Sequence, residues 1–488
     1  MDQFQKEQNE LLEYMIKNVY FDKFNKAKNA TLPPNAQPPG IEFYITSVCN
    51  QKCSYCYLVK YGDKLYPKEI RNQDTIIRNM EHVFEYLLEQ GITYIPRVDL
   101  FSGEIWGMEF GNKVLDTIIK YLEKGIQINE MMIPTNASFI TDDRIAKVID
   151  YYHKRFKSLN VTFRMSASID GAVVEHANRP FRKKDATEQL KTDEYYDKIM
   201  KFFFEHEWGF HPMIDASTIE LQPENYEWWH KQFNKFGYTT YEQFLNYTMF
   251  LEVRNNSWTE DKLKSYAKWL NHILDYDYKN YWVDHEQEFY TSILCSDRNQ
   301  NLIDYNNSIL SKNFVFGYMP TMVAPSDSKR FGCSAGNLLS IRLGDLSMVP
   351  CHRTSYPKFI YGKFDVTDDK ITGVTANNPF LMFNVLGQGT TTQFKCDTCP
   401  INSCCMHGCL GSQWENTNDL FYPVKSVCDL NKVKVIFMAA KAEQFAKLHN
   451  LNTTGISNYG EALVKKLKEK EPEETEKWQT IIANEILI

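Results

Sequence analysis

The chain has 488 residues, which is more than a single hydrophobic core usually holds, so we expect two or three domains. Hydrophobic residues make up 43%, charged residues 24% and aromatic residues 14%, a balance that excludes a disordered chain. The formal net charge is −7, so the chain has no excess of basic residues, which argues against nucleic acid and anionic membrane surfaces as partners.

The first 40 residues predict an N-terminal helix and a linker. Apolar residues recur at helical spacing between residues 3 and 26, and a proline- and glycine-rich stretch follows and ends at Gly40. This N-terminus has no apolar core of the kind a signal peptide needs, and no uncharged apolar run of about 18 residues follows elsewhere. We therefore expect a cytoplasmic protein that acts on a small molecule or a peptide.

Residues 41–257 predict an α/β domain with a parallel sheet. Short apolar runs, typical of buried strands, alternate with longer amphipathic stretches, typical of helices, which is the pattern of right-handed βα units. The short runs are 41–48, 94–101, 130–136 and 161–170, the amphipathic stretches are 74–90, 112–125 and 143–156, and the repetition continues through 194–209 and 212–218 to 249–255.

The remaining chain divides by composition into three further segments. Residues 258–330 predict a helical bridge, with a helix over 259–282 whose N-cap is Thr259. Residues 331–430 hold most of the cysteines and few periodic runs. Residues 431–488 return to helical patterning with a charged face.

The twelve cysteines are clustered, and the clustering indicates metal ligands. A reducing cytosol does not maintain disulfides, so we disfavour a disulfide framework. The first cluster is a CX3CX2C triplet, Cys49, Cys53 and Cys56, placed directly after the first predicted strand. Three thiolates so close can hold one face of a cubane iron-sulfur cluster and leave its fourth iron open. Structural zinc needs a fourth ligand nearby, and no further cysteine or histidine occurs before His82.

This triplet resembles the hallmark of the radical S-adenosylmethionine (SAM) superfamily, a CX3CX2C loop after the first strand of a partial (β/α)6 barrel. The resemblance implies that the three thiolates hold a [4Fe-4S] cluster whose open iron binds SAM. An electron from the cluster then cleaves SAM to a 5′-deoxyadenosyl radical. Tyr55 stands where the family places an aromatic residue beside the adenine.

Three later segments resemble SAM-binding motifs of the same family, each at the end of a predicted strand. Ser102, Gly103 and Glu104 resemble its GGE motif, with serine replacing the first glycine, and the Glu104 carboxylate is an acceptor for the methionyl ammonium. Asn136 ends the third strand as the family's TNG motif does. Ser168 and Asp170, with Arg179 shortly after, resemble the segment that approaches the SAM ribose and carboxylate. Taken alone, each of these segments is also compatible with an ordinary surface turn.

The C-terminal cysteines resemble the SPASM domain, which carries two auxiliary iron-sulfur clusters. The core spacing CX2CX5CX3C is formed by Cys396, Cys399, Cys405 and Cys409, with Cys428 following and Cys333 and Cys351 preceding. The alternative is a zinc ribbon. The resemblance implies three [4Fe-4S] clusters in all and extends over about residues 41–429.

Family topology divides these ligands between two clusters and leaves one of them incomplete. Cys396, Cys399, Cys405 and Cys428 are assigned to the outer cluster, and Cys333, Cys351 and Cys409 to the inner cluster. The inner cluster then lacks a fourth cysteine. Its fourth iron is open, is bound by a group other than cysteine, or is bound by Cys295. Cys404, next to a ligand, stays unassigned. The opening also departs from the pattern, because the stretch from Gly344 to Cys351 is two residues too long.

Proteins with this pair of motifs mostly oxidise or cross-link residues of a peptide or protein. We therefore expect a maturase that forms thioether or carbon–carbon bonds in a ribosomally made peptide and draws electrons from a ferredoxin or flavodoxin. Since only 48 residues precede Cys49, the leader of such a peptide is bound by flanking helices or by a separate protein.

One alternative is an anaerobic sulfatase maturase, in which an aspartate follows the cysteine that Cys351 matches. Here the neighbour is His352, which can also act as a base. The alternative of another class is a zinc-stabilised binding protein without enzymatic activity.

Overall fold

We describe a computed structural model over residues 2–28, 38–107, 109–182, 191–293, 335–386, 395–396, 398–402, 405, 408–454 and 459–487, without the side chains of Ser102 and of 291–293. The chain forms two compact units, and each is described by itself. The first unit comprises Met1–Ile169, Arg179–Gly209 and Cys333–Thr391, and the second comprises Asp170–Asn178, Phe210–Gly332 and Thr392–Ile488.

The first unit is built on a sheet that has nine strands in the described part of the chain. Their order is β11-β10-β9-β8-β1-β2-β3-β4-β5, and β1 to β4 are parallel neighbours. The bounds of these four are β1 Gly40–Thr46, β2 Tyr94–Ser102, β3 Gln127–Thr135 and β4 Thr162–Ala167, and the short β5 is Gly209–Phe210. Parallel strands joined by helices confirm the predicted α/β class and the partial barrel.

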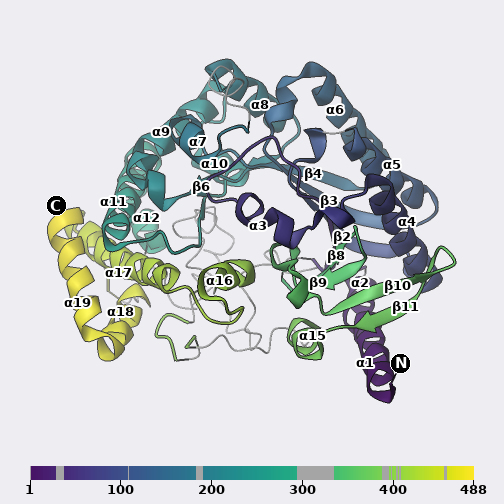
Figure 1. The fold of residues 1–488 in the computed structure, drawn as a ribbon. Coiled ribbons are helices and arrows are strands. Elements are labelled where there is room, and N and C mark those ends of the chain that lie inside the picture. Colours follow the sequence, from purple (N-terminus) through teal and green to yellow (C-terminus); the bar gives the residue numbers. More distant parts are fainter. Residues whose placement is uncertain are drawn as a thin grey trace. The chain divides into compact units, whose positions relative to one another are not determined.

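Helices precede and connect these strands, and all of them except α3 lie where the apolar periodicity predicted a helix. They are α1 Gln3–Met15, α2 Asp22–Ala27, α3 Tyr57–Leu65, α4 Gln73–Glu89, α5 Phe110–Glu123, α6 Asp143–Ser158 and α8 Asp193–Glu205. Figure 1 shows α4, α5 and α6 following one another along one side of the sheet. Their packing is aromatic: the ring of Phe84 on α4 lies 5.7 Å from Phe43 on β1 and 5.0 Å from Tyr121 on α5. Side-chain caps fix four of these helix starts, because a side chain at the N-cap accepts a hydrogen bond from the backbone of the first turn. The capping residues are Asp2, Asn72, Asp142 and Thr192.

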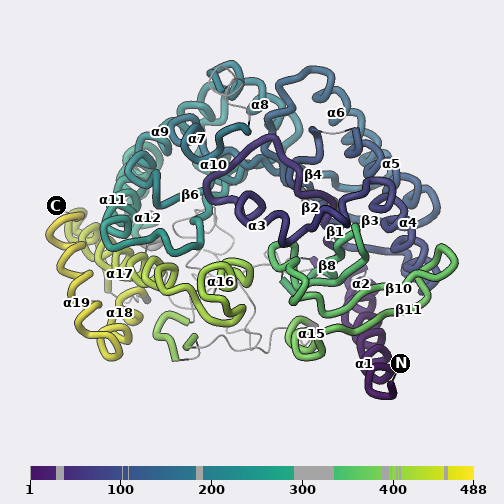
Figure 2. Tube along the Cα trace, in the orientation of Figure 1, coloured from purple at the N-terminus to yellow at the C-terminus, as the bar shows by residue number. Residues whose placement is uncertain are grey.

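A late segment of the chain extends this sheet beyond its first strand. Strand β8 (Leu338–Arg342) pairs in parallel with β1, and β9 (Ser347–Val349), β10 (Gly362–Thr367) and β11 (Lys370–Ala376) continue the sheet as antiparallel neighbours. Figure 2 shows β8 beside β1 although almost 300 residues separate them. Helix α15 (Pro379–Leu386) follows β11. All seven residues of β1 are buried, as expected for a strand with neighbours on both edges.

The second unit is mostly helical. Its elements are α7 Ala172–Asn178, β6 Met213–Ile214, α9 Gln222–Lys235, α10 Tyr241–Tyr247, β7 Leu251–Glu252, α11 Glu260–Asp277, α12 Glu286–Ile293, α16 Leu410–Thr417, α17 Lys425–Leu448, α18 Tyr459–Lys470 and α19 Pro472–Ile481. The long α17 packs against α11, α12, α18 and α19. A buried ion pair, Lys434 to Glu252 at 2.5 Å, ties α17 to β7.

Two details of this unit differ from the sequence expectation. Thr259 occupies the N-cap of α11, but its hydroxyl makes no capping hydrogen bond. The runs 212–218 and 249–255 form strands of only two residues each, paired with one another in parallel. None of the helices in the described ranges is long and apolar enough to cross a membrane.

Candidate active site

The cysteine triplet lies on the loop between β1 and α3, at the carboxyl end of the parallel strands. The backbone amide of Gln51 donates to the Cys49 sulfur at 3.4 Å, and Cys56 is the N-cap residue of α3. The Gln51 amide favours the thiolate form of Cys49, although burial acts more strongly in the opposite direction. The loop therefore presents its sulfur atoms at the edge of the sheet where parallel α/β proteins bind ligands.

The end of β2 is fastened directly to the start of this loop. The amide of Gly103 donates to the Thr46 carbonyl and that of Glu104 to the Val48 carbonyl, each at 2.8 Å. Residue 103 has to be glycine, because a Cβ at that position would lie 2.2 Å from the Val48 carbonyl oxygen. The predicted motif and the cysteine loop are thus one hydrogen-bonded structure.

The Glu104 carboxylate is buried and held by the end of β3. It accepts hydrogen bonds from the Thr135 hydroxyl at 2.9 Å and from the Asn136 backbone amide at 2.7 Å. Burial nevertheless raises the pKa of Glu104 to about 7, against the effect of these hydrogen bonds and of the Arg179 charge. A cation bound beside this carboxylate would therefore stabilise its ionised form.

Asn136 joins this carboxylate to the cysteine loop. Its side-chain amide lies 3.5 Å from the Cys49 sulfur and donates to the Asn50 side chain at 2.7 Å. Burial raises the pKa of Cys49 to about 11, and the Glu104 and Cys56 charges act in the same direction. A metal bound at this sulfur would replace the proton, so these residues are compatible with a cationic metal centre.

The segment that follows Arg179 runs beside the same loop. The Lys52 amide donates to the Pro180 carbonyl at 2.7 Å, and the Arg179 guanidinium lies 5.5 Å from the centre of the Tyr55 ring. Ser168 lies at the end of β4, where its amide donates to the Thr135 carbonyl. The first unit thus gathers Tyr55, Gly103, Glu104, Asn136, Ser168 and Arg179 around the cysteine loop, while the Ser102 side chain is outside the described residues.

Asp170 belongs to the second unit, where its carboxylate already has protein partners. It is fully buried and accepts hydrogen bonds from the Asn178 side chain at 2.9 Å and from the Met213 amide at 3.0 Å. These contacts stabilise the turn into α7. A contact of Asp170 with SAM stays a prediction.

His352 is held in one orientation by a residue that the sequence analysis did not select. Its backbone amide and its Nδ1 atom each contact one carboxylate oxygen of Glu42, at 2.8 and 2.9 Å, and its ring stacks on Phe101 with centroids 3.7 Å apart. Burial alone would raise the pKa of Glu42, but the charge and hydrogen bonds of His352 lower it. In the neutral form of the imidazole, Nδ1–H donates to the Glu42 carboxylate and the Nε2 atom is left as the acceptor. An acidic residue inside an apolar strand was the available signal, because a buried charge needs a partner.

Glu42 is part of a polar row that crosses the sheet. Its register partners are Ser340 on β8 and Asp99 on β2. Asp99 forms an ion pair with Arg97 at 2.6 Å, yet burial raises the pKa of Asp99 to about 6 despite that pair. Residues in one row of a sheet face the same side, so this face of the parallel strands is polar and titratable.

The second unit contains a cavity lined by cysteines. Its lining includes Cys396, Cys405, Cys409 and Cys428, together with Arg254 and Asn431. Burial raises the pKa of Cys428 to about 12, and the nearby Cys405, Cys396 and Cys399 raise it further, against Lys432. Four or more thiols so close oppose one another's ionisation, and a bound cationic cluster removes that conflict.

The remaining predicted cysteines divide between the first unit and undescribed segments. Cys351 is buried in the first unit, and its sulfur lies 3.5 Å from the Thr354 hydroxyl oxygen. Cys295, Cys333 and Cys404 lie outside the described residues. The completion of the inner cluster therefore stays a prediction.

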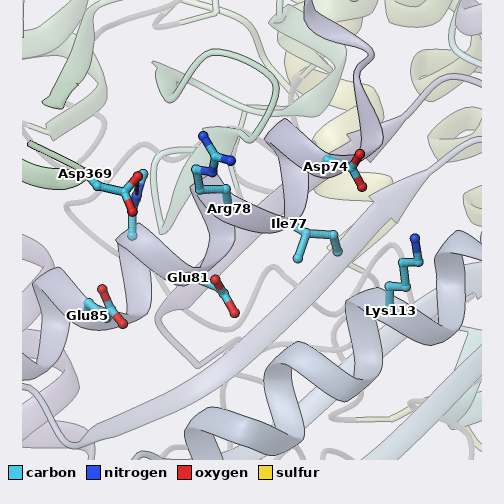
Figure 3. A pocket seen from close by; sticks show the side chains of 8 residues that line it. Asp74, Ile77, Arg78, Glu81, Glu85, Lys113 and Asp369 are labelled. Carbon is cyan, nitrogen blue, oxygen red and sulfur yellow. Dashed lines mark hydrogen bonds and ion pairs between the residues drawn. The ribbon is translucent and has the colours of Figure 1, made fainter.

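A separate cleft of about 360 Å³ lies on the outer side of α4 and contains none of these residues (Figure 3). It is lined by Asp74, Ile77, Arg78, Glu81, His82, Glu85, Lys113 and Asp369. Figure 3 shows acidic and basic side chains from three elements around it, so it has no single sign of charge. We assign it no part in the chemistry.

The first unit is thus an α/β partial barrel with a cysteine triplet at the carboxyl end of its parallel strands, and the second unit holds a cysteine-lined cavity. No protein-family model and no curated protein sequence matches the chain. Solved structures do: anSMEcpe with bound AdoMet aligns with a TM-score of 0.50 at 14% identity, over 88% of this chain and 99% of that one. Streptococcus suis SuiB bound to S-adenosylmethionine aligns with a TM-score of 0.38 at 14% identity, over 79% of this chain and 77% of that one. The likeness to anSMEcpe confirms the fold that the motifs indicated.

Proposed function

We propose that this protein is a radical SAM enzyme that oxidatively modifies a ribosomally made peptide. The observation that carries the proposal is the hydrogen-bonded unit of Cys49, Glu104 and Asn136, built from the ends of three parallel strands. A thiolate triplet, a buried carboxylate and an amide at one edge of a sheet fit a cluster and a zwitterionic cofactor. Its fold, shared with a protein solved with AdoMet, supports the same interpretation.

In this proposal Cys49, Cys53 and Cys56 hold a [4Fe-4S] cluster, and SAM binds beside it. The cofactor pair supplies one-electron chemistry that removes hydrogen from a substrate C–H bond. Glu104 accepts hydrogen bonds from the SAM ammonium, and Thr135 and Asn136 keep its carboxylate aimed at that position. Tyr55 and Arg179 border the adenosyl side of the site.

The C-terminal cysteines provide the second part of the proposal, two auxiliary [4Fe-4S] clusters that accept the electron left after hydrogen removal. Cys396, Cys399, Cys405 and Cys428 hold the outer cluster, which their mutual electrostatic influence supports. Cys333, Cys351 and Cys409 hold the inner cluster. A ferredoxin or flavodoxin supplies electrons, and a separate protein or the flanking helices bind the peptide leader.

The inner cluster offers a site for the substrate itself if only three cysteines hold it. A cysteine of the peptide would then bind the open iron, which would place its sulfur for a thioether bond. A cognate peptide should perturb the electron paramagnetic resonance signal of that cluster, and the same peptide with serine in place of cysteine should not. Equal spectra with both peptides would contradict substrate ligation.

The experiment that tests the central activity is SAM cleavage by protein reconstituted anaerobically with iron and sulfide. Reduced protein should release 5′-deoxyadenosine, and a variant with Cys49, Cys53 and Cys56 all changed to alanine should release none. The iron that this variant retains at the other cysteines shows that it is folded. Release of 5′-deoxyadenosine by the triple variant would overturn the assignment.

A second candidate, formylglycine formation on a protein, is favoured by the Glu42–His352 pair. A fixed imidazole beside Cys351 is a suitable proton acceptor for oxidation of a cysteine or serine side chain. Co-expression of the protein with small reading frames encoded nearby, followed by analysis of the products, distinguishes peptide cross-linking from formylglycine formation. A peptide that loses two hydrogen atoms without gaining an aldehyde supports cross-linking, whereas a product that reacts with a hydrazide supports formylglycine.

A further inference from the structure

A second group of metal-ligating side chains lies in the first unit, on the helices that cover β4. Asp150 and His153 are one turn apart on α6, and His206 caps the C-terminal end of α8. One ligand atom from each of the three lies within 4.8 Å of the others. Figure 1 shows α8 next to α6, and the contact between His153 and His206 joins the two helices.

The imidazole of His206 is oriented as a metal-binding histidine usually is. Its Nδ1 atom contacts the Phe202 carbonyl oxygen at 2.7 Å, and because a carbonyl only accepts, Nδ1 carries the hydrogen. In the neutral imidazole the Nε2 atom is then the one left to bind a metal, and it lies 3.5 Å from Asp150 Oδ1. Metal-ligating histidines commonly donate their other ring N–H to a backbone carbonyl, which fixes the tautomer.

Aromatic packing holds both rings in place. The buried indole of Trp208 stacks on His206 at 4.6 Å and meets His153 edge-on at 5.3 Å, and its Nε1 donates to the Phe163 carbonyl. The two imidazoles lie 4.9 Å apart. Ligands fixed before the metal arrives lose little side-chain entropy on binding.

The distance between Asp150 and His206 fits two ligands of one tetrahedral ion. Two ligands at the usual zinc bond lengths lie roughly 3.3 Å apart, close to the 3.5 Å between Asp150 Oδ1 and His206 Nε2. The other Asp150 oxygen pairs with Lys154 at 2.5 Å, and that lysine side chain is 73% exposed, so it can move away from a bound cation. An ion pair between Asp150 and a protonated His206 is the competing explanation.

We propose that Asp150, His153 and His206 form a Zn²⁺ site that joins α6 to α8, with a water molecule as the fourth ligand. Two imidazoles and one carboxylate are a common set of zinc ligands. The group contains no cysteine, so it would not bind an iron-sulfur cluster in place of zinc. The site is independent of the proposed catalytic function. Its role is structural, because it ties together two helices packed beside the sheet.

The test is zinc binding by cluster-loaded protein after EDTA treatment, measured by equilibrium dialysis with elemental analysis. Wild-type protein should bind one more Zn²⁺ per chain than His206→Gln or His153→Gln, with affinity at least about tenfold higher. The variants keep all twelve cysteines, so zinc at thiols cancels in the comparison. His285→Gln, an exposed histidine paired with Glu288, is the matched control and should bind like wild type.

A thermal readout separates the site from the ion pair. Added Zn²⁺ should raise the melting temperature of the wild-type protein and the His285→Gln control, and leave both site variants unchanged. Equal zinc content in wild type and His206→Gln, or an equal zinc-induced shift, would overturn the proposal.

Discussion

Glu104 is a buried carboxylate that accepts hydrogen bonds from Thr135, Asn136 and Trp106, and the proposed SAM site depends on it. Replacing it with glutamine keeps the shape and removes the charge. We predict that Glu104→Gln weakens SAM binding by about one to two decades, the loss expected for a charge-assisted hydrogen bond of about 1.5 to 3 kcal/mol. Calorimetric titration of SAM into cluster-loaded protein measures this.

The matched control is Glu109→Gln, an exposed glutamate at the start of α5. It should bind SAM like wild type, and both variants should keep wild-type iron content. If Glu104→Gln bound SAM as tightly as wild type, Glu104 would not contact SAM and would serve only in the turn after β2.

His352 carries the second prediction about a single residue. We expect His352→Gln to lower product formation by roughly 10²- to 10⁴-fold, the usual contribution of a positioned base, while 5′-deoxyadenosine is still released. His82→Gln is the control, because His82 also contacts a carboxylate, Asp369 at 3.1 Å, but lines the cleft of Figure 3. Mass spectrometry of the substrate against 5′-deoxyadenosine yield gives both quantities. Wild-type product formation in His352→Gln would remove His352 from the mechanism.

Some of these site residues can be identified from the sequence and others cannot, for a physical reason. Cys49 and Glu104 stand in motifs whose spacing is short and local, so the sequence alone is enough to select them. The contact between Glu42 and His352 spans 310 residues and arises only because β8 pairs with β1. No local pattern encodes such a contact.

For helices and strands too, local patterns could be predicted from the sequence and non-local pairings could not. Helices with a strong apolar period, such as α4 to α6, and the buried strands between them occur where their patterns predicted. The extension of the sheet by β8 to β11 was not predicted, because short strands in a cysteine-rich segment show little periodicity and their pairing is non-local. The two-residue strands β6 and β7 are likewise too short for a period to define their bounds.

The junction between β2 and the cysteine loop gives a further prediction. Gly103→Ala should lower stability by about 1 to 3 kcal/mol, because the new methyl group would overlap the Val48 carbonyl. The amount of iron bound by the cysteine triplet should also decrease, because the cysteine loop must shift to make room for the methyl group. Thermal unfolding and iron analysis measure the two effects.

Gly62→Ala is the control for that substitution. Gly62 lies in α3, just after the triplet, and a Cβ there meets nothing within 4 Å. Alanine in a helix interior should preserve or raise stability, by up to about 1 kcal/mol. If Gly103→Ala behaved like Gly62→Ala, the close contact would not be a constraint on the site.

In the whole molecule, three sets of cysteines are proposed to hold clusters, and the metal content of the protein tests this proposal most directly. Thiols at Cys49 and Cys428 have raised pKa values, about 11 and about 12, which a bound cationic cluster would reverse. Anaerobically reconstituted protein should be brown and bind about twelve iron atoms per chain, four for each cluster. A colourless protein with stoichiometric zinc at its cysteines and no iron would contradict the account.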